Sequence, residues 1–483
     1  MLPASIDESN RARFEVAARD DETLISPSLN THTASRLSIY VVMTASLALF
    51  GEASALPPGF QKQAIYGNSG LPATIRFAPD GRLFVAEYFS GQILVYTNPP
   101  FGGHTVWATL SANTVDGVPG MAFHPSFPDS PYVYFMHAST SPHFYRVVRF
   151  TDGGTQGTDY TVIFDGIRAD LADHHGGRLA FGPEGMLYVS IGDKDHPADA
   201  QDPANLAGKI LRLDPMGLVP AGNPFGAGNP VFALGLRNPF GLTFDSLIGT
   251  GYLTENGPSC DDEVDLLVAG ANYGWDENYA CGSPMAGSER PLLSFTPTIA
   301  PVGCSVYRGN KYSQFDGQLF FGSYVDRAVR RVVFQSGNPA TVESVEVFVD
   351  WPYNPTIPDE NVLDVTTGTD GRLWVSTLHH IWRILEPQPA AVDASNRRVS
   401  FEATPNPFSH GILFAVPEAT PLHRLEVLDI AGRRVRTWNG PIVGNLPWDG
   451  RRADGGDLAP GIYLARGVSA GGISIRRLVH LSP

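Results

Sequence analysis

One strand–turn–strand pattern recurs along the chain and restricts the folds open to it. Its clearest copies lie at residues 77–85, 181–189 and 369–375, and looser copies lie at 121–136, 241–254 and 305–333. In the clear copies an Asp-Gly or Glu-Gly pair precedes a run of aromatic and β-branched residues, and such pairs favour tight hairpin turns. Repetition of one unit over about 300 residues predicts a β-propeller, and the spacing allows roughly five to seven sheets around its channel.

Composition supports an all-β fold. The 483 residues include 51 Gly and 40 Pro, and only 17% are charged, which suits many short strands joined by tight turns. The length exceeds one ordinary domain, although propellers run long as single domains. A formal net charge of −15 argues against nucleic acid or an anionic membrane as the partner, because both need a basic face.

Residues 1–55 are interpreted as a polar extension followed by a secretory signal peptide. Residues 37–50 form an apolar run after Arg36, and Ala53-Ser54-Ala55 gives an A-x-A ending. The run is short for a bilayer span, so we expect cleavage after Ala55 and no membrane span afterwards. An uncleaved anchor is the alternative. The mature protein is then expected to be secreted, periplasmic or at the surface of a bacterium.

A second module is predicted after a linker at residues 387–400. Residues 401–483 contain Pro405-Asn406-Pro407-Phe408, an alternating strand at 425–430 and Trp448-Asp449-Gly450. They resemble the immunoglobulin-like C-terminal modules of exported bacterial proteins, such as type IX sorting domains and the flagellar hook-cap domain. This resemblance implies a small β-sandwich that engages secretion machinery, and a spacer without a sorting role is the alternative.

Two stretches concentrate groups that carry chemistry. The first combines the permanent cation of Arg237, the turn Gly257-Pro258 and three successive carboxylates at 261–263, and it closes at 272–275. Backbone carbonyls and carboxylates are ligands of hard cations such as calcium. The second stretch, residues 173–179, begins Asp-His-His-Gly-Gly. A histidine beside a carboxylate can act as a general base, and a structural histidine is the alternative.

These motifs resemble the soluble quinoprotein aldose dehydrogenases of the glucose/sorbosone dehydrogenase family, over about residues 59–386. The resemblance implies a six-bladed β-propeller at residues 56–386, followed by the small β-sandwich. It also implies oxidation of a sugar or related alcohol with pyrroloquinoline quinone (PQQ) and calcium, the electrons passing to an external acceptor.

The resemblance also implies the site residues. His174, beside Asp173, would take the hydroxyl proton while hydride passes to the quinone, and Arg237 would stabilise charge on the reduced quinone. The cofactor-binding residues would be Asn238, Thr298 and Arg327. The calcium ligands would be Gly257, Pro258, Asp262, Glu263 and Tyr273.

Cys260, Cys281 and Cys304 are the three cysteines of the chain. They show no CxxC spacing, so a zinc site is not indicated. The resemblance implies that Cys260 pairs with Cys281 in an exported chain and that Cys304 is a buried thiol.

Several cofactor positions depart from the family pattern. Asn361 and Leu363 stand where the family has two arginines, Val115 stands where it has Gln or Glu, and a lysine expected within 323–327 is missing. PQQ is a tricarboxylate, and a hydrogen bond to a charged group contributes roughly 1.5–3 kcal/mol. The alternative is therefore a propeller without cofactor that binds carbohydrate or protein. A calcium-dependent lactonase-type propeller would need carboxylates from several sheets, and the sequence offers one acidic cluster.

Overall fold

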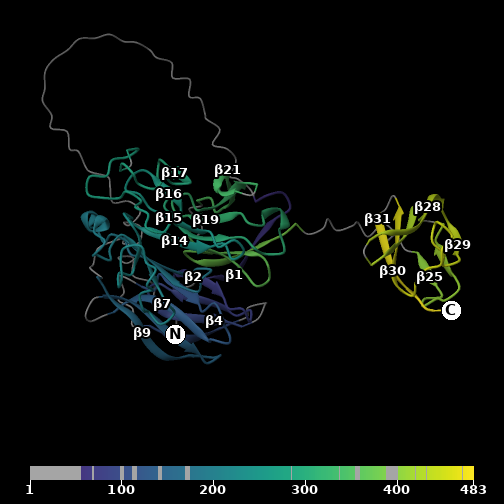
Figure 1. Ribbon diagram of the computed structural model, residues 1–483, viewed down its shortest axis with the longest axis horizontal. Coiled ribbons are helices and arrows are strands. Elements are labelled where there is room, and N and C mark those ends of the chain that lie inside the picture. The colour runs from purple at the N-terminus through teal and green to yellow at the C-terminus, as the bar shows by residue number, and fades with distance from the viewer. Residues whose placement is uncertain are drawn as a thin grey trace, which may run out of the picture. The chain divides into compact units, whose positions relative to one another are not determined.

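The computed structural model describes residues 56–67, 70–97, 103–110, 117–139, 144–168, 174–283, 285–336, 338–353, 359–387, 401–418, 420–430, 432–469 and 472–482. The predicted leader at 1–55 and nearly all of the predicted linker lie outside these residues. The chain divides into two compact units, Met1–Pro387 and Gln388–Pro483 (Figure 1). In the described part of the chain, no helix has the length and apolar character to cross a membrane.

The described residues of the first unit form six four-stranded antiparallel sheets. Five of them use consecutive strands. The first sheet contains β2(Pro72–Phe77), β3(Leu83–Glu87), β4(Gln92–Tyr96) and β5(His104–Thr109), and the second contains β6(Gly120–Phe123), β7(Tyr132–Ala138), β8(Phe144–Asp152) and β9(Gly157–Arg168). The third contains β10(Gly176–Phe181), β11(Leu187–Ile191), β12(Lys209–Leu213) and β13(Val231–Leu234), the fourth contains β14(Pro239–Phe244), β15(Gly251–Glu255), β16(Asp262–Leu266) and β17(Leu293–Phe295), and the fifth contains β18(Pro301–Val306), β19(Leu319–Ser323), β20(Ala328–Gln335) and β21(Asn338–Asp350). The sixth contains β22(Val362–Thr367), β23(Leu373–Thr377), β24(His380–Leu385) and the N-terminal strand β1(Gln61–Gly67).

These sheets form a closed ring. The first strands β2, β6, β10, β14, β18 and β22 each pack on the next, and β22 packs back on β2. Pairing of β1 with β24 joins the two ends of the unit within one sheet. The prediction of a β-propeller is confirmed, since sheets around a ring bury both faces and leave only short edges.

The recurrent sequence pattern falls on the first hairpin of each sheet. The predicted acidic–Gly turns are present, because Gly81, Gly185 and Gly371 have φ angles of 93°, 79° and 76°. Every residue of β3 and β11 is buried, whereas the fourth strand β9 is largely exposed. A strand covered on both faces needs a continuous apolar run, and the aromatic and β-branched runs after the turns supply it.

An ion pair crosses the centre of the ring. Arg178 on β10 and Asp364 on β22 belong to the third and sixth sheets, and their side chains are 1% and 0% exposed, with Nη1 3.3 Å from Oδ2. Arg178 also donates to the carbonyls of Phe240 and Leu363, each at 2.9 Å. Asp364 accepts from Arg76 Nη1 on β2 at 2.6 Å. The network therefore ties four of the sheets together, and burial lowers the pKa of Arg178.

The second unit is a small β-sandwich, as predicted. A three-stranded sheet has the order β25(Glu402–Thr404), β26(Ile412–Val416), β29(Gly444–Trp448), and a four-stranded sheet has the order β28(Arg434–Ile442), β27(Leu422–Asp429), β30(Gly461–Ser469), β31(Gly472–His480). Phe401, Phe414, Val427, Trp448 and Leu478 belong to the core between the sheets. Two sheets that share one apolar core define a sandwich.

Candidate active site

The two chemistry-bearing motifs meet where neighbouring inner strands begin. His174 precedes β10, and Arg237 and Asn238 precede β14. Asn238 Oδ1 accepts a hydrogen bond from the backbone N–H of Gly176 at 3.1 Å. The backbone N–H of Asp193 donates to the Arg237 carbonyl at 2.7 Å. The fold thus brings together segments that lie some 60 positions apart in the chain.

A buried carboxylate orients His174. Its Nδ1 lies 2.7 Å from Asp193 Oδ1 and 3.1 Å from Asp195 Oδ1, and the Asp193 side chain is 0% exposed. Because carboxylates face Nδ1, the proton of the neutral ring resides there and Nε2 carries the lone pair that can accept another proton. Asp173, which sequence analysis gave this orienting role, lies outside the described residues.

The sequence did not suggest a role for Asp193, because this residue follows β11, the second strand of the hairpin, and lies 19 positions after His174. The sequence does carry a signal, since Gly192 precedes it: a Cβ at Gly192 would lie 1.8 Å from the His174 carbonyl oxygen. Only glycine allows the two segments to approach so closely. His174, Lys194 and Asp195 also have positive φ angles, of 60°, 57° and 57°, and such backbone strain clusters at functional sites.

Arg237 is held in the same network. Its Nη1 donates to the Gly257 carbonyl at 2.8 Å, and its guanidinium lies 5.5 Å from the centre of the Trp275 ring. Trp275 Nε1 donates to Asp193 Oδ2 at 2.7 Å. One chain of contacts therefore links the histidine, its carboxylate, an indole and a permanent cation. Arg237 is only partly buried, so its charge can act on a bound group.

The Glu255 side chain holds the backbone at Arg237 and Asn238 through hydrogen bonds. Its Oε1 accepts hydrogen bonds from the N–H groups of Arg237 and Asn238 at 2.6 and 2.8 Å. Its Oε2 has no hydrogen-bond partner among the described residues. Burial raises the pKa of Glu255 well above its ordinary value, although these two hydrogen bonds oppose the shift.

Asp262, predicted as a calcium ligand, is already occupied by backbone groups. Its Oδ1 accepts from Gly257 N at 2.9 Å, and its Oδ2 accepts from Ile299 N at 2.6 Å and Ala300 N at 2.7 Å. Burial raises the pKa of Asp262 to about 6. This carboxylate joins the Gly257-Pro258 turn to the loop that carries Thr298, which is half-buried.

Asp265 is a buried carboxylate that the sequence motifs did not single out. It is 0% exposed, and neither of its oxygens has a hydrogen-bond partner in the described part of the chain. Burial and the charges of Glu263, Glu255 and Glu289 raise its pKa well above the ordinary value. Glu263 and Asp265 are two positions apart on β16, so alternation places them on one face. Burial likewise raises the pKa of Glu263 to about 7.

Tyr273 borders this acidic cluster. Its side chain is nearly buried, and its hydroxyl donates to the Leu266 carbonyl and accepts from Val268 N. The negative charge of Asp265 adds to burial in raising the pKa of this phenol. The ring therefore braces the strand that carries Asp265.

The positions that depart from the family pattern have structural roles. Asn361 Nδ2 donates to the Tyr324 carbonyl at 2.8 Å, and Leu363 is 1% exposed in a core cluster.

Arg327 Nη2 lies 3.3 Å from Asp359 Oδ1. Arg330 and Arg331 are paired with Asp326 and Glu346. Val115 lies outside the described residues.

The predicted disulfide is confirmed. Cys260 and Cys281 are bonded, with their Cα atoms 5.9 Å apart, and they close a loop that follows the Gly257-Pro258 turn. Cys304 is a buried free thiol, as predicted.

Replacing both disulfide cysteines by serine is expected to lower the free energy of unfolding by about 3 kcal/mol, because the bond restricts the unfolded chain over 21 positions. Urea unfolding followed by tryptophan fluorescence measures the change. Wild-type protein under reducing conditions should show the same loss. Equal stability of the oxidised wild type and the double variant would contradict this prediction.

Comparison with known proteins identifies the first unit. A family model described as Glucose / Sorbosone dehydrogenase matches residues 70–384. Aldose sugar dehydrogenase YliI of Escherichia coli is 27% identical over 366 residues, 69% of this chain and 94% of its own length. Quinoprotein glucose dehydrogenase B of Acinetobacter calcoaceticus is 28% identical over 347 residues, which are 60% of this chain and 71% of that protein. A Thermus thermophilus crystal structure assigned as a glucose dehydrogenase superposes with a TM-score of 0.60 at 32% identity, covering 68% of this chain and all of that one.

Proposed function

Since this chain belongs to the glucose/sorbosone dehydrogenase family, we propose that it oxidises a sugar or related alcohol with PQQ and calcium. The observation that carries the proposal is His174, whose Nδ1 lies 2.7 Å from the buried carboxylate of Asp193. That carboxylate also binds Trp275, on which the Arg237 guanidinium lies. A base and a permanent cation in one network are what this reaction requires.

Each site residue has a separate role in the proposed reaction. When bound, the quinone supplies a hydride acceptor for the carbon that bears the substrate hydroxyl. His174 Nε2 accepts the hydroxyl proton, and Asp193 stabilises the positive charge that the ring then carries. Arg237 places a permanent positive charge beside the cofactor, while Asn238 and Thr298 offer polar groups to it. Arg327 is the guanidinium that we assign to a cofactor carboxylate, in competition with Asp359.

The donor set also suits calcium. Asp265 and Glu255 carry buried oxygens without partners in the described chain, and an uncompensated buried carboxylate is costly unless a cation lies near it. Glu263 is on the same face of β16 as Asp265. The Gly257 carbonyl accepts from Arg237 but keeps a second lone pair. We therefore assign calcium to Gly257, Pro258, Glu263 and the Tyr273 carbonyl, with Asp265 and Glu255 supplying charge, and treat Asp262 as a loop-positioning group.

Calcium is expected to stabilise the protein through Asp265. At a free calcium concentration 100-fold above Kd, the free energy of unfolding should rise by about 2.7 kcal/mol. Asp265→Asn should be more stable than the wild type in a chelator, because it removes a buried carboxyl group whose ionised form has no partner among the described residues, and should gain little from calcium. Urea unfolding with calcium or with a chelator measures both effects. Glu277→Gln, an exposed change in the same region, is the control, and equal calcium gains in all three proteins would sink the assignment.

Activity with sugars tests the proposed function. The purified protein, loaded with PQQ and calcium, should reduce an electron-accepting dye when given an aldose, and substrates lacking an oxidisable hydroxyl should give no rate. A second candidate is a propeller of the same family without cofactor, which binds carbohydrate or protein. The burial of Leu363 and the engagement of Asn361 favour it, because neither position can offer a cation. Saturable sugar binding with no dye reduction under any loading would support this candidate.

We also propose that the chain is exported and that its C-terminal unit engages secretion machinery. The A-x-A ending before Leu56 supports the first part. The N-terminal sequence of the secreted protein should begin at Leu56, and a product that retains Arg36 would contradict cleavage there.

A further inference from the structure

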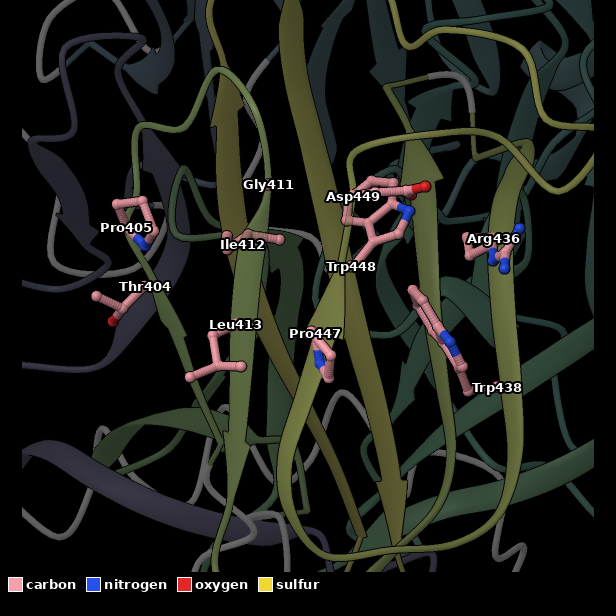
Figure 2. Close-up of a pocket in the computed structure, with 10 residues that line it drawn as sticks. All are labelled: Thr404, Pro405, Gly411, Ile412, Leu413, Arg436, Trp438, Pro447, Trp448 and Asp449. Atoms are coloured by element: carbon pink, nitrogen blue, oxygen red, sulfur yellow. The ribbon is translucent and has the colours of Figure 1, made fainter.

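The β-sandwich unit carries a groove that the proposed oxidation does not use. Its volume is about 610 Å³, within the roughly 300–1,000 Å³ range of small-molecule sites. Figure 2 shows side chains of β28 facing those of β25, β26 and β29 across it. The groove joins the edges of the two sheets, and most of its lining residues belong to strands.

One wall is an apolar row across the three-stranded sheet. Thr404 lies opposite Leu413, and Leu413 lies opposite Pro447, in the strand register. Leu413 is 37% exposed, whereas its neighbours Ile412 and Phe414 are buried, so the row faces outward. The sheet therefore presents an apolar strip to the groove (Figure 2).

The other wall is the indole of Trp438. Its ring centre lies 6.0 Å from that of Trp448, at 81°, and 5.9 Å from that of Phe414, at 64°. These edge-to-face contacts fix the Trp438 ring at the edge of the core. Trp448 is itself fixed, because its Nε1 donates to the Arg451 carbonyl at 2.8 Å. A rigid aromatic surface binds with little loss of side-chain entropy.

Polar groups of both signs line the groove. The Arg436 guanidinium is 5.7 Å from the Trp438 ring centre, and one of its N–H groups donates to the Arg452 carbonyl at 3.2 Å. The Asp449 side chain also lines the groove and is exposed. A guanidinium has five N–H donors and a carboxylate has several acceptor sites. The opposite charges favour a neutral ligand rich in both donors and acceptors.

We propose that this groove binds a neutral saccharide chain. A pyranose has an apolar C–H face, which suits the indole of Trp438 and the strip around Leu413. Its hydroxyl rim both donates and accepts, which suits Arg436 and Asp449. Binding at this groove would hold the protein on a carbohydrate surface. It would require neither quinone nor calcium.

Native electrophoresis of the full chain through gels containing dextran, xylan or a soluble β-glucan tests this site. At least one polysaccharide should retard the wild type. Arg436→Gln and Trp438→Ala should each weaken retardation at least tenfold in apparent affinity. Arg434→Gln is the matched control, since Arg434 is on the same strand, has a side chain 72% exposed and does not line the groove.

The site would be overturned if none of the three polysaccharides retarded the wild type, or if both groove variants retained the retardation in full. Binding of a proline-rich peptide in place of saccharide, lost in the same variants, would also overturn it. Trp438 packs on the core, so its replacement can affect folding. Arg436→Gln tests the groove without this effect, because the Arg436 side chain lies at the rim. Dye-linked oxidation of a monosaccharide should be unchanged in all variants, so this inference and the proposed oxidation can fail separately.

Discussion

Replacing His174 by alanine is expected to lower the turnover number by about 10²- to 10⁴-fold while leaving quinone affinity nearly unchanged. The reason is geometric: Nδ1 is held by Asp193 and Asp195, so Nε2 is the position that can take the substrate proton. Steady-state dye-linked oxidation gives the rate, and a titration followed by quinone absorbance gives the affinity. His124→Ala, a change in a partly exposed histidine outside the site, should leave both quantities unaltered.

Asp193→Asn separates orientation of the base from simple support of the loop. The amide keeps the size of the side chain but cannot stabilise a positively charged imidazole, so turnover should fall and the acidic limb of its pH dependence should shift to lower pH. A purely structural role would change stability and leave the pH profile in place. If His174→Ala retains more than about a tenth of wild-type turnover, His174 is not the base.

Replacing Arg178 by methionine should lower the free energy of unfolding by about 3–5 kcal/mol, because it removes one of the two cations that face the buried carboxylate of Asp364 and two buried hydrogen bonds. That carboxylate is 0% exposed and would keep Arg76 as its remaining cationic partner. The same change removes the hydrogen bonds to the carbonyls of Phe240, in the fourth sheet, and Leu363, in the sixth. Urea unfolding followed by near-ultraviolet circular dichroism reports the loss of propeller packing.

The control for this change is a more exposed ion pair. Arg146 lies 2.9 Å from Asp165, with side chains 24% and 43% exposed, and pairs of this kind contribute about 0–1 kcal/mol. Arg146→Met should therefore have a small effect. A loss for Arg178→Met no larger than that for Arg146→Met would show that the central network does not hold the sheets together.

Much of the fold could be predicted from the sequence because its information is local. Each acidic–Gly pair specifies a turn, and Gly81, Gly185 and Gly371 do take positive φ angles. The runs after them specify buried strands. Closure by β1 was not predicted, since the pairing of Gln61 with Leu385 spans the whole unit and leaves no mark on either segment alone.

The site could be predicted only in part, for a similar reason. The sequence pointed to His174 and Arg237, which the fold brings into one network, and to Asp173, which lies outside the described residues. It gave no indication of Asp193, which reaches His174 only through the β10–β11 hairpin. It also counted Asp262 as a ligand, whereas three backbone N–H groups occupy that carboxylate. Asp265 escaped notice because nothing in a sequence shows that a carboxylate is buried without a partner.

The most direct test of the account is a titration of the purified, cofactor-free protein with PQQ in the presence of calcium, followed by one addition of an aldose. We expect saturation at one quinone per chain at micromolar concentrations, and then a change of the quinone spectrum to the reduced form on addition of the sugar. An absence of saturable binding, or bound quinone that no aldose reduces, would contradict it and leave the cofactor-free binding propeller in its place.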